Sequence, residues 1–291
     1  MGNILRGKEA LEALAKRFPQ LYVAPEEGAQ DAHRLAGGRG IAPEGANLEH
    51  FISNEEDELR EVDTPAGPIE VLFLKERHDF ETFLQIIGNK SQPVPIARSV
   101  GAITYRGLPD WGKVAAAHAA YFEGGGNDWS SEFARLAKEP GSFRAEIVVI
   151  SEGPYSNVPA SDTPFGEGEW LKVSREIRLH HECAHVVCRR TMPGDVLPVW
   201  DEVTADVMGL LCATGNYDSS LAARFLGVTA GGYAGGRLSE YLNEDQNAQI
   251  DEIAIKVHAS LITIEGLCGD RKQESPFDFL VELKRDPLLV Y

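Results

Sequence analysis

The order of apolar and polar side chains predicts a mixture of helices and strands in the first half of the chain. Residues 8–18 repeat apolar side chains at helical spacing and predict an amphipathic helix. Residues 58–63 and 69–74 alternate or run apolar around Thr64-Pro65-Ala66-Gly67, a pattern typical of a hairpin. Residues 19–45 are rich in Pro, Gly and Ala, and we expect a long surface loop or a partly disordered arm there. Further helices are predicted at residues 79–87, 110–122 and 130–138, and strands at residues 102–105 and 145–151.

The remainder of the chain has the apolar spacing of successive helices. The glycine-rich run at residues 231–236 lacks the Lys-Ser/Thr and the preceding strand of a phosphate loop, so we expect a hinge or a close backbone approach. Helices are predicted at residues 169–190, 199–210 (closed by Gly215), 220–226, 237–242, 248–267 and 276–284. The pattern predicts an α+β fold, with a small mixed sheet in an amino-terminal lobe of residues 1–168 and a helical lobe of residues 169–291.

Composition and charge narrow the classes of function. The 291 residues are 43% hydrophobic, enough for the core of one large domain or two lobes. The formal net charge of 28 − 45 = −17 opposes binding to nucleic acid and to membranes; such a surface serves solubility or favours basic substrates. No apolar run approaches the roughly 20 residues of a membrane span, and residues 1–8 lack an apolar signal core. Because there are also only four cysteines and no CxxC pair, we expect a cytoplasmic protein. The sequence does not determine its oligomeric state.

The most specific chemical signal is the HExxH motif in Leu179-His180-His181-Glu182-Cys183-Ala184-His185. On a helix, residues four apart share a face, so His181 and His185 can both offer an imidazole nitrogen to one metal ion. Glu182 lies about 100° further round the helix, where its carboxylate can take a proton from a water bound to that ion. The motif therefore predicts a metallohydrolase site.

The surroundings of the motif favour a metal over a chance match. Ile177, His181, Ala184 and Cys188 fall on one stripe of the predicted helix, so the histidines belong to the face that it buries. A buried histidine pair without a partner carries a desolvation cost, which a metal removes. A closed structural site that uses the Cys188 thiolate is disfavoured, because Cys188 starts roughly 10 Å along the helix axis from His181. We expect the cysteines to behave as small buried hydrophobes.

A third metal ligand is expected on the helix predicted at residues 199–210. Glu202 and Asp206 are four residues apart and share a face of this helix. Glu202 can complete a site of two histidines and one glutamate, and Asp206 can hold the outer nitrogen of His181.

HExxH followed by ExxxD resembles the gluzincin metallopeptidases, the thermolysin-like group. The resemblance covers about residues 170–215 and implies a bound Zn²⁺. It implies His181, His185 and Glu202 as zinc ligands, Glu182 as general base, and Asp206 as the partner of a histidine ligand. The two motifs are also similar to those of a set of bacterial proteins with His-Glu-Cys-x-His and Asp-Glu-x-x-Ala-Asp, for which no substrate is established.

The chain departs from the gluzincin pattern in two respects. Gluzincins usually have Asn before the third ligand, where this chain has Asp201, and no motif assigns the group that would stabilise the oxyanion. Candidates for that group are Tyr233, Arg237, Tyr241 and His258, although His258 also fits a core histidine on an apolar helix.

The resemblance further implies a zincin-like fold with the active-site cleft between the two lobes. In such folds a strand at the cleft edge precedes the metal helix. Residues 145–155 are therefore expected to form the upper wall of the cleft, or else an ordinary sheet strand. The segment 153–168 is expected to be a lid or a simple connection.

Three classes of function remain open. The motifs favour a zinc metallopeptidase that acts on a peptide or protein substrate through Glu182. A zinc hydrolase of a non-peptide amide or another small molecule would use the same residues. A metal-binding regulatory protein without turnover is the third class, but a purely structural site would not need Glu182.

Overall fold

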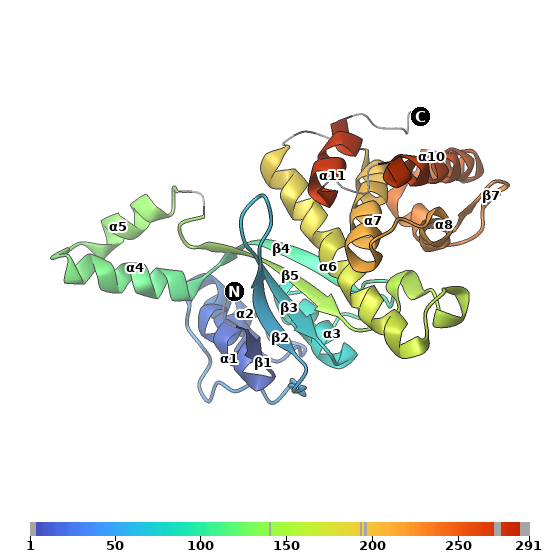
Figure 1. The fold of residues 1–291 in the computed structure, drawn as a ribbon. Coiled ribbons are helices and arrows are strands. Elements are labelled where there is room, and N and C mark those ends of the chain that lie inside the picture. Colours follow the sequence, from blue (N-terminus) through green and yellow to red (C-terminus); the bar gives the residue numbers. More distant parts are fainter. Residues whose placement is uncertain (1–3, 140, 193, 195–196, 271–274, 286–291) are drawn as a thin grey trace. The chain divides into compact units, whose positions relative to one another are not determined.

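The chain folds into two compact units, and each mixes helices with strands, which confirms the α+β class. The computed structural model describes residues 4–139, 141–192, 194, 197–270 and 275–285 (Figure 1). The first unit comprises Met1–Val62 and Ile69–Ser151, and the second comprises Asp63–Pro68 and Glu152–Tyr291. The second unit thus begins earlier than residue 169, where the helical lobe was expected to start. In the described part of the chain, no helix combines the length and apolar character that a membrane span requires.

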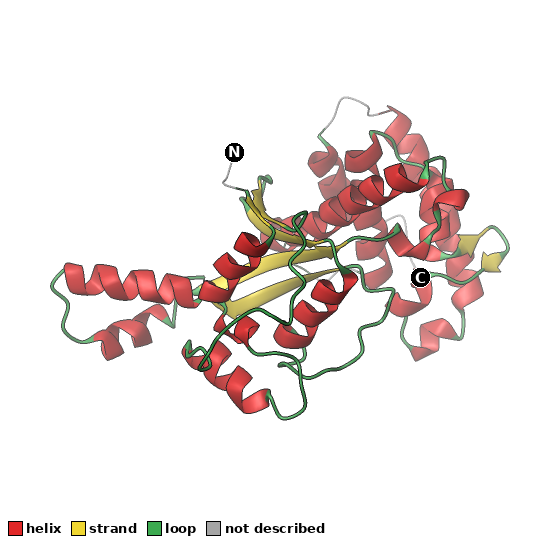
Figure 2. Cartoon of the chain, turned by 90° about the horizontal axis from the view of Figure 1, so that it is seen from below, coloured by secondary structure: helices red, strands yellow, loops and turns green. Residues whose placement is uncertain are grey.

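The first unit is built on a five-stranded mixed sheet with the strand order β1-β2-β3-β5-β4. Figure 2 shows this sheet in yellow, with red helices packed beside it. β3 and β5 are parallel, and the other neighbouring strands are antiparallel, including the predicted β2–β3 hairpin. β4 is longer than expected, because a bulge at Gly107, with φ at 72°, lets pairing with β5 resume at Leu108. The strands are β1 (Leu5–Arg6), β2 (Glu58–Val62), β3 (Ile69–Leu74), β4 (Ala102–Pro109) and β5 (Arg144–Ser151).

Helices cover one face of this sheet. Alternate residues of β3 and β5, such as Leu72 and Ile147, share a core with Leu11 of α1 and Phe83 of α3. Asp110 caps α4, since its carboxylate accepts a hydrogen bond from the backbone N–H of Lys113. The helices of this unit are α1 (Lys8–Arg17), α2 (Gln30–Arg39), α3 (Arg77–Ile87), α4 (Trp111–Glu123) and α5 (Trp129–Leu136).

The expectation of a long loop or disordered arm at residues 19–45 is wrong. The segment contains the 3₁₀ turn η1 (Pro19–Tyr22) and helix α2. Pro19 stands at the first position of η1, where its missing N–H costs nothing, and Gly40 ends α2 in a left-handed conformation with φ at 69°. Pro and Gly here mark the ends of short elements, and Leu21 and Ala36 between them are buried.

The second unit is mainly helical and packs around Trp170, Trp200 and Phe225. The glycine-rich run contributes to a small hairpin, and Gly227 and Gly235 approach so closely that a Cβ at Gly227 would clash with the backbone. The expected close backbone approach is therefore confirmed, and the run lies within one unit. The helical elements are η2 (Tyr155–Asn157), η3 (Ala160–Asp162), α6 (Glu167–Thr191), α7 (Pro198–Thr214), α8 (Ser219–Leu226), η4 (Arg237–Tyr241), α9 (Glu244–Asn247), α10 (Ile250–Asp270) and α11 (Pro276–Arg285), and the hairpin strands are β6 (Val228–Thr229) and β7 (Gly232–Tyr233).

Candidate metal centre

Helices α6 and α7 carry the predicted metal ligands and run antiparallel at short range. A Cβ at Gly209 would lie only 2.8 Å from the carbonyl oxygen of Ile177, so the two backbones can approach this closely only because residue 209 is a glycine. One turn further along α6, His181 contacts Asp206. The following turn brings His185 against Glu202. Because the two helices are antiparallel, each successive turn of α6 contacts an earlier turn of α7. This register places Glu202 beside both histidines.

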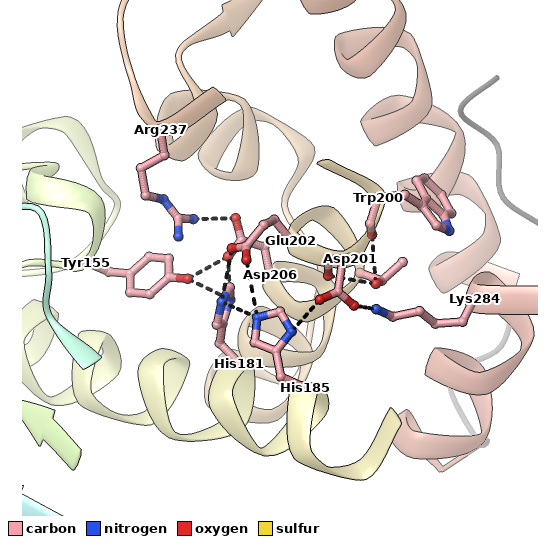
Figure 3. Close-up of polar contacts among 10 residues, drawn as sticks. Tyr155, His181, His185, Trp200, Asp201, Glu202, Asp206, Arg237 and Lys284 are labelled. Carbon is pink, nitrogen blue, oxygen red and sulfur yellow. Dashed lines mark hydrogen bonds and ion pairs between the residues drawn. The ribbon is translucent and has the colours of Figure 1, made fainter. Parts of the chain in front are cut away.

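Three ligand atoms converge between the two helices. The Nε2 atoms of His181 and His185 lie 3.1 Å apart. The Glu202 carboxylate lies 3.4 Å from Nε2 of His181 and 3.5 Å from Nε2 of His185, through its two different oxygens (Figure 3). Within the described ranges, this is the one cluster of His, Cys, Asp and Glu side chains whose donor atoms are close enough to share a metal ion.

The outer nitrogen of each histidine is held by a carboxylate. Nδ1 of His181 lies 2.9 Å from Oδ1 of Asp206, and Nδ1 of His185 lies 2.9 Å from Oδ2 of Asp201. Each Nδ1 therefore carries the proton and donates it, which leaves the lone pair of each Nε2 directed toward the other ring and Glu202. Two facing lone pairs and a carboxylate need a cation among them, so the donor set fits a metal ion.

The electrostatics of the cluster also favour a cation at this point. Burial alone would lower the pKa of His181, but hydrogen bonds and charge from Asp206 and Glu202 raise it to about 9. Burial and the charge on His181 lower the pKa of His185 to about 4. Burial would raise the pKa of Glu202, yet His181 holds it at about 2. The carboxylate is thus ionised, and the two imidazoles accept one proton between them.

Tyr155 and Arg237 complete the surroundings of Asp206. The Tyr155 hydroxyl donates to Oδ1 of Asp206 at 2.5 Å and lies 2.9 Å from Nδ1 of His181. Arg237 donates to Oδ2 of Asp206 at 2.6 Å, and its guanidinium lies 4.8 Å from the centroid of the Tyr155 ring. Burial raises the pKa of Tyr155 well above its usual value, so the phenol keeps the proton that it donates.

The segment that carries Tyr155 is a connection packed firmly on α6. The backbone N–H of Tyr155 donates to Oγ of Ser174, and the indole of Trp170 donates to the carbonyl of Val158. Arg178 donates to the carbonyls of Gly153 and Pro154. These bonds fasten residues 153–158 to α6 and place Tyr155 against His181.

On the other side of the cluster, Asp201 lies between His185 and Lys284. Its Oδ2 accepts from His185, and its Oδ1 accepts from the ammonium group of Lys284 on α11 (Figure 3). Each histidine is therefore backed by a carboxylate, and each carboxylate by a cation: Asp206 by Arg237, and Asp201 by Lys284.

Glu182 lies next in sequence to His181 and is half-buried. Its negative charge raises the pKa of His185, against the larger lowering by burial and by the charge on His181. Glu182 is not one of the three converging donors, which agrees with its position a third of a turn away on α6.

The four candidate oxyanion donors separate into two pairs. Arg237 lies at the metal centre but bonds to Asp206, and burial, together with the charge on Glu202, raises the pKa of Tyr241. The Tyr233 hydroxyl donates to the carbonyl of Gly236. His258 lies half-buried on α10, and no contact joins it to the cluster in the described part of the chain.

Sequence analysis missed Tyr155 and Lys284. Tyr155 lies in a Pro- and Ser-rich connection and Lys284 on a helix at the far end of the chain, so neither shares a local motif with the ligands. Asp201 was noted only as a departure from the gluzincin pattern. That departure was the available signal, because a carboxylate in place of an amide can form an ion pair with a cation.

Comparisons with known proteins give one match. A family described as a family of unknown function, DUF7005, matches residues 5–265. No curated protein and no solved structure matches the chain.

Proposed function

The chain belongs to the DUF7005 family, whose function is unknown, and from the chemistry of its metal centre we propose that it hydrolyses peptide bonds with Zn²⁺ and Glu182. One observation carries the proposal. His181, His185 and Glu202 direct three donor atoms to one point, with Glu182 beside them. A site of this kind leaves a coordination position for water, whereas a structural site is closed by a fourth protein ligand.

Zinc suits the donors better than the other common divalent ions. Two imidazole nitrogens and one carboxylate oxygen form a set typical of catalytic zinc, while Mg²⁺ and Ca²⁺ prefer oxygen ligands alone. In this site zinc would supply Lewis acidity and lower the pKa of a water molecule to about 7. The antiparallel packing of α6 on α7 supports a zincin-like arrangement, with two ligands on the first helix and the third on the second.

Glu182 would move the proton during the reaction. It would take a proton from the attacking water as the water oxygen bonds to the substrate carbonyl carbon. It would then give that proton to the nitrogen of the leaving amine as the carbon–nitrogen bond breaks. Asp206 and Asp201 would keep His181 and His185 oriented with Nε2 inward throughout.

A peptide mixture tests this proposal. The zinc-loaded full chain is incubated with diverse peptides, and the products are identified by mass spectrometry. We expect cleavage by the wild type and by Glu169→Gln, a control at an exposed position of α6. We expect no cleavage by Glu182→Gln at an unchanged zinc content, because an amide cannot accept the proton.

Other results would redirect the assignment. Cleavage by Glu182→Gln at the wild-type rate would reject the role of Glu182. Turnover of small amides without cleavage of any peptide would favour a hydrolase of non-peptide substrates. Zinc binding without turnover of either would favour a metal-binding regulatory protein.

A further inference from the structure

We propose that helix α11 is part of the metal centre, and that Lys284 is a positioning residue that orients His185 through Asp201. The inference rests on the proposed zinc site but not on the reaction carried out there. Three sets of contacts within the second unit support it: the ion pair itself, the packing of α11, and the matching arrangement behind the other histidine.

The Lys284–Asp201 ion pair is partly withdrawn from water. The Lys284 side chain is only 2% exposed, whereas most lysines lie in solvent. A buried ammonium needs a compensating charge, and Asp201 is its ion-pair partner in the described part of the chain. Asp201 uses its other oxygen to accept from Nδ1 of His185. Loss of the ammonium would therefore free the carboxylate that fixes the ring.

Apolar and polar contacts hold α11 against both metal helices. Leu280 is buried among Ala184 and Cys188 of α6 and Ala205 and Met208 of α7. The small side chains at positions 184 and 205 leave room for a third helix close to the ligands. One turn along α11, the Trp200 indole donates to the carbonyl oxygen of Leu283 at 3.0 Å. Since Trp200 precedes Asp201 and Leu283 precedes Lys284, this bond holds the backbone of Lys284 near that of Asp201.

A similar pair of a carboxylate and a cation lies behind His181. There, Asp206 is buried and is compensated by Arg237 at 2.6 Å. Behind His185 the chain has a carboxylate, Asp201, rather than an amide. A carboxylate makes the imidazole a stronger donor to a metal. The Asp201 side chain is 36% exposed, whereas that of Lys284 is buried, so the buried ammonium needs Asp201 as its counter-charge and fixes the direction of the carboxylate that holds His185.

Lys284 also lies outside the part of the chain that the family match covers, which ends at residue 265. The three converging ligands and Asp201 lie inside it. The chain thus completes its metal centre with a helix from beyond the matched segment.

Zinc affinity tests the pair directly, measured on the full chain by competition with a chelator. We expect Lys284→Met to weaken zinc binding by about 10-fold, the lower end of the effect of losing a direct partner of a ligand, because Lys284 acts on His185 only through Asp201. Methionine keeps an unbranched apolar side chain and removes the charge. Lys284→Arg should recover most of the affinity, and Lys256→Met, at an exposed lysine of α10, should have no effect.

A double variant separates a positioning role from a general loss of structure. If Lys284 acts through Asp201, then Lys284→Met should have little further effect on zinc affinity in an Asp201→Asn background. Unchanged zinc affinity in Lys284→Met, or full additivity of the two substitutions, would overturn the inference. Zinc binding without hydrolysis by the wild type would refute the proposed function and leave this inference intact, whereas a wild type that binds no zinc would refute both.

Discussion

The Nε2 atoms of His181 and His185 lie 3.1 Å apart, with their Nδ1 atoms turned outward to carboxylates. This relationship fixes both the tautomer and the direction of each ring. Neither imidazole can rotate without breaking a hydrogen bond to Asp206 or Asp201. These hydrogen bonds hold the two nitrogen donors in place, which reduces the reorganisation that metal binding requires.

Asp206 supports both the metal site and the fold, and the two contributions can be separated. Asp206→Asn should lower zinc affinity by about 10- to 100-fold, because an amide holds the His181 Nδ1–H less strongly. Asp206→Ala should also lower the free energy of unfolding by about 3–5 kcal/mol, because it leaves the buried Arg237 guanidinium without a counter-charge. Chelator competition and urea unfolding measure the two effects. Wild-type zinc affinity in both variants would show that Asp206 does not orient His181.

Gly209 sets the distance between the two metal helices. Gly209→Ala should lower the free energy of unfolding by about 1–3 kcal/mol, because the added methyl would press on the carbonyl of Ile177. Zinc affinity should fall with it, since α7 carries Glu202. The matched control is Gly266→Ala on α10, where a Cβ meets no atom within 4 Å. We expect that change to stabilise the fold by about 0.5–1 kcal/mol. Equal effects of the two substitutions on urea unfolding would contradict the close approach.

The buried Asp57 carboxyl makes the free energy of unfolding depend on pH. Its Oδ1 accepts from the backbone N–H of Lys75, but within the described residues its buried Oδ2 has no hydrogen-bond partner. Burial raises the pKa of Asp57 from 3.8 to about 6. A raised carboxyl pKa means that the folded state binds more protons, so this group costs stability as pH rises from about 4 through 6.

Asp57→Asn should therefore stabilise the protein at pH 7.5 by roughly 3 kcal/mol relative to the wild type, since each unit of pKa shift corresponds to about 1.4 kcal/mol. The asparagine keeps an oxygen for the Lys75 N–H and removes the charge. At pH 4.5 the difference should be much smaller, because the wild-type carboxyl is then protonated in the folded state. Urea unfolding of both proteins at the two pH values measures it, and a difference independent of pH would reject this account.

The convergence of His181, His185 and Glu202 could be predicted from sequence because the geometry within each helix is local. His181 and His185 are one turn apart on a single helix, and Glu202 and Asp206 are one turn apart on another. Helix periodicity alone places each pair on one face. The hairpin of β2 and β3 and the cap at Asp110 were predictable for the same reason, since both depend on neighbouring residues.

The parts that escaped prediction depend on contacts between distant segments. Tyr155 and Lys284 reach the histidines only because α6 and α7 provide a surface on which a connection and a third helix pack. The helix at Gln30–Arg39 was missed because its glycines suggested a loop, although burial of Ala36 stabilises it. Tertiary packing overrides local propensity in such weakly patterned segments.

Metal content tests the central claim most directly. The full chain and two variants, His185→Ala and Glu202→Gln, are purified with one equivalent of Zn²⁺, passed through a desalting column and analysed for bound metal. We predict one zinc per chain in the wild type and a severe loss in each variant, because each removes one of three donors. Equal zinc content in the wild type and His185→Ala would contradict the metal centre described here.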